Sequence, residues 1–209
     1  MAEPPPGLAG HPDRLRWNAR YETAGYRPSF RPHPLTVRVL SEAFPGCPAA
    51  GGPLPGGPVL ELACGPSGSA LLAAASGRHV TAVDVSDVAL HLLRAAASAR
   101  GLDHLITTAQ ADLTSWQPGP AVYALVLCTG YWDRDVFRAA ARAVRDGGAL
   151  AWEALTLAAR RERPQLPAQW CLQPGEPASL LPADYRVLSQ DDIGQPATRR
   201  QLLAVRAPG

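Results

Sequence analysis

Lysine is absent from this chain of 209 residues, so all 20 of its strongly basic side chains are arginine. Without a lysine amine there is no P-loop, no pyridoxal Schiff base and no lysine general base. The 18 acidic residues leave a formal net charge of +2, and the arginines are spread along the chain. We therefore expect no nucleic-acid partner.

Cysteine is also scarce, with Cys47, Cys64, Cys128 and Cys171 far apart and none in a Cys-x-x-Cys pair. None of the five histidines has a partner at zinc spacing, which predicts free thiols, no metal site and a cytoplasmic enzyme. The first seven residues lack the basic start and apolar core of a signal peptide, and no run of about 20 apolar residues occurs. We expect no membrane partner.

Two segments are rich in proline and glycine, residues 1–13 and residues 45–57. We expect the first to be a disordered tail and the second to be too poor in side chains to pack. Apolar side chains recur at helical spacing over 35–44, which predicts a helix that covers a sheet. The sequence thus predicts one domain over 14–209, with a cover segment at 14–57 and a core at 58–209.

Strand and helix patterns alternate through the core, and the last two strands follow each other without a helix. This order is typical of an α/β, Rossmann-like, doubly wound sheet with helices on both faces. Its seven strands would be mostly parallel, with an antiparallel C-terminal hairpin. The predicted strands are 59–63, 79–84, 105–108, 123–128, 149–153, 185–189 and 200–205, and the predicted core helices are 69–75, 87–100 and 134–144.

A glycine turn follows the first predicted strand, in the segment Gly65-Pro-Ser-Gly68. A nucleotide-like ligand approaches a backbone only where side chains are small. Gly65 and Gly68, with Ala63 and Ser67, leave such an opening at the carboxyl end of a strand. We expect a ligand there.

Two acids follow the turn. Asp84 ends the next strand, 19 residues beyond Gly65, at the spacing that suits ribose hydroxyls. A dinucleotide and S-adenosylmethionine both fit this spacing, but the loop lacks the Gly-x-Gly-x-x-Gly pattern of a dinucleotide site. Asp112, after the third strand, could accept from an adenine amino group, for which a dehydrogenase has no standard need. An NAD(P)-dependent oxidoreductase remains an alternative.

On these residues the chain resembles the class I S-adenosylmethionine-dependent methyltransferases. The loop Glu61-Leu-Ala-Cys-Gly65 is similar to their acidic glycine loop, Asp84 to their ribose acid and Asp112 to their adenine-edge acid. Residues 145–150 resemble the turn before their fifth strand. The element Trp17-Asn-Ala-Arg-Tyr21 resembles one shared by the small tellurite-resistance and thiopurine-type enzymes. Departures from the loop pattern are Ala at 63 and Pro-Ser at 66–67.

The resemblance implies S-adenosylmethionine as cofactor, with Glu61 facing its ammonium group. Plainer interpretations stay open: a helix terminus or an arginine as the partner of Glu61, helix or turn capping by Asp84 and Asp112, and core packing by Val85 and Leu113. The expected cofactor-binding residues are Trp17, Tyr21, Glu61, Ala63, Gly65, Ser67, Gly68, Asp84, Val85, Asp112, Leu113, Cys128 and Thr129.

The loop after the fourth predicted strand contains Tyr131, Trp132 and Asp133. These residues are the candidates for an acceptor pocket and for catalysis. Aromatic packing is their plainer interpretation. The Asp/Asn-Pro-Pro-aromatic motif of nucleic-acid amino-methyltransferases is missing here. If the acceptor is a hydroxyl, Asp133 or Glu153 could remove its proton.

The sequence therefore predicts a monomeric or homodimeric methyltransferase that acts on a small-molecule acceptor by in-line displacement. A non-catalytic cofactor-binding protein is the alternative from another class. Arg160, Arg161 and Arg163 could steer an anionic acceptor toward the site, although a solvated charge run explains them as well.

Overall fold

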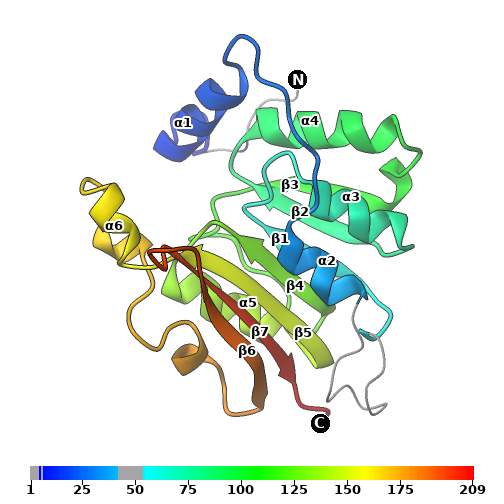
Figure 1. Ribbon diagram of the computed structural model, residues 1–209. Helices are drawn as coiled ribbons and strands as arrows, with labels where there is room; N and C mark the ends of the chain where they lie inside the picture. The colour runs from blue at the N-terminus through cyan, green and yellow to red at the C-terminus, as the bar shows by residue number, and fades with distance from the viewer. Residues whose placement is uncertain (1–4, 6, 42–53) are drawn as a thin grey trace.

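A computed structural model describes residues 5, 7–41 and 54–209 (Figure 1). One sheet of seven strands has the order β3-β2-β1-β4-β5-β7-β6. The first five strands run parallel to one another, and β7 is antiparallel to both β5 and β6. This confirms the predicted fold. The strands are β1 (Val59–Leu62), β2 (Val80–Asp84), β3 (Ile106–Gln110), β4 (Tyr123–Thr129), β5 (Val144–Leu155), β6 (Tyr185–Ile193) and β7 (Arg199–Arg206).

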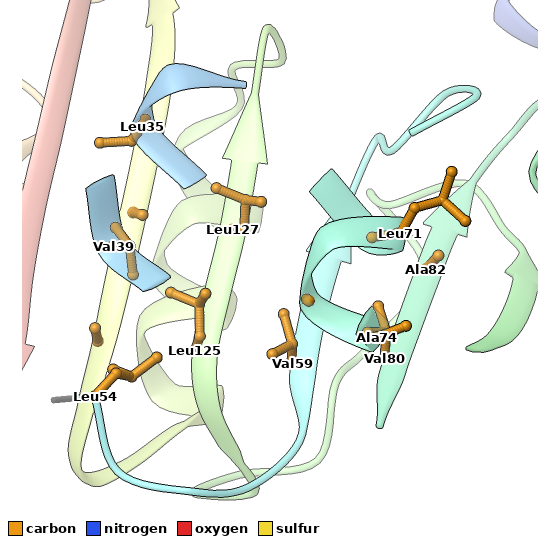
Figure 2. Close-up of a cluster of buried hydrophobic side chains, with 14 of the residues drawn as sticks. Leu35, Val39, Leu54, Val59, Leu71, Ala74, Val80, Ala82, Leu125 and Leu127 are labelled. Carbon is orange, nitrogen blue, oxygen red and sulfur yellow. The ribbon is translucent and has the colours of Figure 1, made fainter. Parts of the chain in front are cut away.

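Helices cover both faces of the sheet because each central strand is buried on both sides. In β1, Val59 packs in one hydrophobic cluster, whereas Leu60 and Leu62 pack in the other. The first cluster lies under α2 (Pro34–Ser41), α3 (Gly68–Ala75) and α4 (Asp87–Ser98), and the second lies under α5 (Arg134–Ala143). Figure 2 shows the first cluster, with side chains of α2 and α3 directed at β1, β2 and β4.

Short elements complete the chain around the sheet. Helix α1 (Pro12–Tyr21) and the short helix α6 (Ala159–Glu162) lie beyond the carboxyl ends of the parallel strands (Figure 1). Three short 3-10 helices lie in connections between other elements: η1 (Asp103–Leu105), η2 (Ala168–Trp170) and η3 (Ala178–Leu180).

Some expected boundaries differ from the structure. Helix α1 starts at Pro12 and Leu8 is buried, so the expectation of a disordered tail is wrong for residues 7–13. Strand β5 begins at Val144 rather than 149, because a register shift in its pairing with β4 accommodates the glycine turn inside the strand. The described residues do not include residues 42–44 of the helix predicted over 35–44. They also do not include residues 45–53 of the segment rich in proline and glycine.

The strand order reverses between β1 and β4, so the connections that leave these two strands cross to different sides of the sheet. Ligands of open α/β sheets bind in the crevice at such a point. The predicted glycine turn follows β1, and Thr129 ends β4. The fold therefore brings both predicted loops to the one edge where a cofactor is expected.

Candidate functional site

The glycine turn has the backbone conformation that its sequence predicts. Gly65 has a φ of +57°, a region that glycine enters without the steric cost paid by other residues. Ala63, which stands where the resembled loop has a glycine, also has a positive φ, of +48°. A non-glycine residue in this region stores about 1 kcal/mol of strain. The turn is thus held open at some cost at the end of β1.

Asp84 is tied to this turn. Its carboxylate accepts hydrogen bonds from the backbone amides of Gly65 and Ser86, each at 2.8 Å. Burial raises the pKa of Asp84, and hydrogen bonds from the backbone amides of Ser86, Gly65 and Val85 partly oppose that rise. Asp84 is not the cap of α4: the N-cap is Ser86, whose hydroxyl accepts from the amide of Ala89, and Asp84 bonds to the amide of that cap residue. A carboxylate can accept about four hydrogen bonds, so these amides leave it able to accept from a ligand.

Glu61 lies buried in β1 and faces the first turn of α3. The hydroxyl oxygen of Ser67 is 2.8 and 2.7 Å from its two carboxylate oxygens, and the same hydroxyl accepts from the amide of Ala70 to cap α3. Burial raises the pKa of Glu61 to about 8, against the hydrogen bonds from Ser67 and Ala70. A helix terminus is therefore its partner in the protein alone, and a ligand cation would meet a carboxyl that is still protonated at neutral pH.

Asp112 forms a small turn of its own. Its carboxylate accepts from the amide of Thr114 at 3.0 Å and from the Thr114 hydroxyl at 2.7 Å, as the turn-capping interpretation expects. The Nε2 atom of His11 lies 3.7 Å from Oδ2, the carboxylate oxygen that also accepts from the Thr114 hydroxyl. The Nδ1 atom of His11 is buried and has no hydrogen-bond partner among the described residues. An unsatisfied polar atom of this kind fits a site that a polar ligand completes.

The predicted aromatic cover lies against the glycine turn. The rings of Trp17 and Tyr21 stack with centroids 5.9 Å apart, and a Cβ atom on Gly65 would come 3.1 Å from the Tyr21 hydroxyl. Asn18 holds the helix in place, because its side chain accepts from the hydroxyl of Ser86 at 2.6 Å. Helix α1 thus connects the cofactor turn with the start of α4. Nothing in the local sequence of α1 predicts that contact.

Gly68 does not leave the opening that was expected. A Cβ atom there would lie 2.3 Å from the backbone carbonyl oxygen of Phe30 and 2.5 Å from the carbonyl carbon of Arg31. The small residue is needed so that the cover segment can pack directly on the start of α3. This packing accounts for the small residue at position 68, and the expected contact of Gly68 with the cofactor stays a prediction.

Trp132 lies in the hydrophobic core. Its side chain is 4% exposed, and its ring lies 5.5 Å from Phe137 and 6.3 Å from Trp152. The plainer interpretation, aromatic packing, is correct for this residue. Its indole Nε1 has no partner among the described residues.

Asp133 is the N-cap of α5, and its Oδ1 accepts from the amides of Asp135 and Val136 at 2.9 and 3.0 Å. This task accounts for the carboxylate, so its expected role as a base is not supported. Tyr131 is half-buried. Burial, followed by the charge of Asp133, raises the pKa of its phenol, which therefore stays protonated and can donate a hydrogen bond.

The remaining predicted residues line the ends of neighbouring strands. Cys128 is buried at the end of β4, and burial raises the pKa of its thiol well above the usual range, which argues against a nucleophile. Leu113 is buried in the core cluster beneath α5, whereas Val85 and Thr129 are half-buried. A shallow hollow of about 320 Å³ lies between Leu113 and α5 and includes Asp133.

A cluster that the sequence analysis missed surrounds Glu153 near the end of β5. Its buried carboxylate accepts from Arg199 and Gln201 of β7, each at 2.7 Å, and His33 lies 3.3 Å away. Burial alone would raise the pKa of Glu153, but the hydrogen bonds from His33 and Gln201, the His33 charge and the Arg199 hydrogen bond lower it to about 2. Such a carboxylate is a weak base, so its expected role in proton removal is not supported. The pairing of β5 with β7 and the position of the segment before α2, both long-range contacts, bring these residues together.

The residues that are present fit an S-adenosylmethionine molecule. The turn at Gly65 offers bare backbone, Asp84 offers free lone pairs, and the unpaired His11 nitrogen lies beside Asp112. No group of three His, Cys, Asp or Glu side chains that could hold a metal ion occurs within the described ranges. In the same ranges, no helix is both long and apolar enough to cross a membrane.

Comparisons with known proteins agree with this geometry. Residues 59–148 match the family model described as a methyltransferase domain, and a search of curated proteins gives no match. The chain is similar in structure to a protein of echinomycin biosynthesis connected with conversion of a disulfide bond into a thioacetal group, with a TM-score of 0.63 and 22% identity over 93% of this chain and 91% of that one.

Two further solved structures are similar. One is an S-adenosylmethionine-dependent methyltransferase from Mesorhizobium loti, with a TM-score of 0.60 and 18% identity over 74% of this chain and 93% of that one. The other is the magnesium protoporphyrin IX methyltransferase of Synechocystis PCC 6803 with bound S-adenosylhomocysteine, with a TM-score of 0.58 and 16% identity over 74% and 76%. At these identities the likeness is one of fold.

The matched methyltransferase domain and the fold shared with S-adenosylmethionine-dependent methyltransferases support the class I resemblance, with S-adenosylmethionine as cofactor. The special likeness to the tellurite-resistance and thiopurine-type enzymes stays a prediction.

Proposed function

We propose that this protein transfers the methyl group of S-adenosylmethionine to a small-molecule acceptor. The observation that carries the proposal is the bond between Asp84 and the Gly65 amide at the point where the strand order reverses. It places a buried acid and a bare backbone turn side by side, as a nucleoside ligand requires. Asp84 would accept from the ribose hydroxyls, Asp112 from the adenine amino group, and Glu61 would face the ammonium group.

When bound, the cofactor supplies a methyl group that its sulfonium sulfur has already activated. The work of the chain is then mainly to position the acceptor and to exclude water. Tyr21 and the rest of α1 cover the turn, and the protonated hydroxyl of Tyr131 would donate a hydrogen bond to an acceptor atom beside the end of β4. Because Asp133 caps a helix and the pKa of Glu153 is about 2, we infer that the acceptor needs no strong protein base.

A small acceptor is favoured by what borders the site. Helix α1 and the segment around α6 both lie at the carboxyl edge of the sheet (Figure 1), and Arg16 of α1 lies 5.9 Å from the Trp170 ring that follows α6. A macromolecule would need this edge to be more open. Small ligands suit a site that is enclosed from two sides.

The test is titration calorimetry with S-adenosylhomocysteine, followed by a turnover screen over thiols, phenols, amines and oxyanions that detects release of the same product. We expect binding by the wild type and none by Gly65→Val, with a native circular dichroism spectrum. NAD and NADP serve as controls and should not bind. Binding without turnover of any acceptor would favour the non-catalytic alternative, and binding of NAD in place of S-adenosylhomocysteine would refute the proposal.

A further inference from the structure

Two segments that are far apart in the sequence meet through aromatic and arginine side chains beside the candidate site. The guanidinium carbon of Arg16 on α1 lies 5.5 Å from the ring centroid of Trp17 and 5.9 Å from that of Trp170 in η2. Arg20, one turn along α1, lies 5.6 Å from the Trp17 ring. Figure 1 shows α1 and the segment around α6 on the same side of the sheet. Contacts between arginine and aromatic faces thus connect the cover with the β5–β6 connection.

Further positive charge gathers at the same place. Cys171 follows Trp170 directly and is buried; burial raises the pKa of its thiol, and the charges of Arg160 and Arg163 oppose that rise. Those two guanidinium groups therefore lie close enough to act on the residue next to Trp170. We refer to this region as the arginine–tryptophan face, made up of Arg16, Trp17, Arg20, Arg160, Arg163 and Trp170.

The arginines of this face differ from the structural arginines of the protein. Arg14, Arg134 and Arg199 each form an ion pair with a buried or half-buried carboxylate. Across residues 7–41 and 54–209, neither Arg16 nor Arg20 forms an ion pair. Both are exposed.

Arg160 and Arg163 resemble Arg16 and Arg20 in this respect. Within the described part of the chain, Arg160 and Arg163 have no carboxylate partner; Arg160 donates only to the carbonyl of Leu166. The Trp170 side chain is 41% exposed, an unusual place for so large an apolar surface. The face thus combines unneutralised guanidinium groups with an aromatic ring that is open to solvent.

Guanidinium groups bind carboxylates and phosphates through paired hydrogen bonds, and tryptophan rings stack on flat ligands. We propose that the acceptor is a small aromatic anion whose ring packs on Trp170 and whose acidic group is bound by Arg16 and Arg20. Arg160 and Arg163 add to the positive potential that attracts it. This inference rests on the proposed function, because it names the class of acceptor for the same site.

The experiment compares acids with their neutral esters on protein saturated with S-adenosylhomocysteine. The pairs are 4-hydroxybenzoate and its methyl ester, and 2-mercaptobenzoate and its methyl ester. Titration calorimetry should show at least one acid bound about tenfold or more tightly than its ester. Raising the salt concentration should weaken binding of the acid and leave the ester unchanged.

Variants test which side chains cause the preference for the acid. In the double variant Arg16→Gln/Arg20→Gln we expect the preference for the acid to fall to near parity, whereas Trp170→Leu should weaken acid and ester together. Arg94→Gln, which changes an exposed arginine on α4, is the matched control and should keep the full preference. The salt series on the wild type gives the same information if the double variant does not fold.

Three results would overturn the inference: equal or tighter binding of the esters, no binding of either acid at millimolar concentration, or tighter binding of a single-stranded oligodeoxythymidylate than of both acids. Separate titrations with S-adenosylhomocysteine alone test the proposed function. If that ligand does not bind, the proposed function fails, whereas the comparison of acid and ester on the free protein still decides the charge preference of the face.

Discussion

The carboxylate of Asp84 accepts a hydrogen bond from the backbone amide of Gly65 at 2.8 Å, so the end of β2 fixes the turn that follows β1. The same carboxylate accepts from the amide of Ser86 at the start of α4. One buried acid therefore orients the cofactor turn and a helix terminus together. The site is preorganised by groups of the protein before a ligand arrives.

Replacing this acid should damage binding more than folding. Charge-assisted hydrogen bonds to ribose hydroxyls contribute roughly 1.5 to 3 kcal/mol each, so Asp84→Ala should weaken S-adenosylhomocysteine binding at least tenfold in titration calorimetry. Asp103→Ala, an exposed acid at the opposite edge of the sheet, is the control and should bind normally. Unchanged affinity in Asp84→Ala would remove this residue from the site.

Glu61 should couple cofactor binding to proton release. Its pKa of about 8 means that it is protonated at neutral pH, whereas an ammonium group favours the ionised form. Affinity for S-adenosylhomocysteine should therefore rise with pH between about 5.5 and 7.5, and calorimetry in two buffers of different ionisation enthalpy should detect released protons. Glu61→Gln should abolish the release. A pH-independent affinity in the wild type would contradict this coupling.

The raised pKa of Glu61 also predicts how the free energy of unfolding changes with pH. Between its usual value of 4.5 and about 8, Glu61 holds its proton in the folded protein but loses it in the unfolded chain. The free energy of unfolding should therefore fall as pH rises through this window, by at most about 1.4 kcal/mol per pH unit for this one group. Urea titrations should show a flatter dependence for Glu61→Gln. An equal slope in both proteins would mean that Glu61 ionises normally.

The strands and helices of the core could be predicted from the sequence because the patterns that define them are local. The alternating apolar runs and the cap residues Ser67 and Ser86 mark where strands end and helices begin, and the structure has both caps. Asp133 directly precedes a strongly amphipathic helix, and an aspartate in that place is a sequence signal for the cap of α5. The interpretation as a base overlooked a signal that was present.

The rest could not be predicted because it depends on contacts between distant segments. Helix α1 is mostly polar, so its stability comes from docking: Asn18 bonds to Ser86, and Arg14 pairs with Asp87 at 2.7 Å. The burial of Glu153 beside Arg199 depends on the pairing of β5 with β7. No spacing of residues along the sequence predicts these contacts.

Gly68 should prove to be a packing residue of the cover. A Cβ atom there would meet the Phe30 carbonyl oxygen at 2.3 Å, and a backbone atom cannot turn aside as a side chain can. Gly68→Ala should therefore loosen residues 22–41, which limited proteolysis would detect as faster cleavage in that segment. Gly56→Ala is the control, since nothing lies within 4 Å of its added Cβ. Equal cleavage rates in the two variants would count against this role.

Trp132 should behave as a core residue and not as a pocket wall. Its ring is 4% exposed and packs edge-on against Trp152, so Trp132→Ala leaves a large cavity and should lower the free energy of unfolding by about 3 to 5 kcal/mol. Urea denaturation measures this loss. Cofactor affinity and turnover should then fall together, as the population of folded protein falls, and Trp132→Phe should recover much of both. Trp170→Ala, which changes an exposed ring, provides the contrast: its stability should change by less than about 1 kcal/mol. A Trp132→Ala protein of normal stability that binds cofactor but has lost turnover would restore Trp132 to the acceptor pocket.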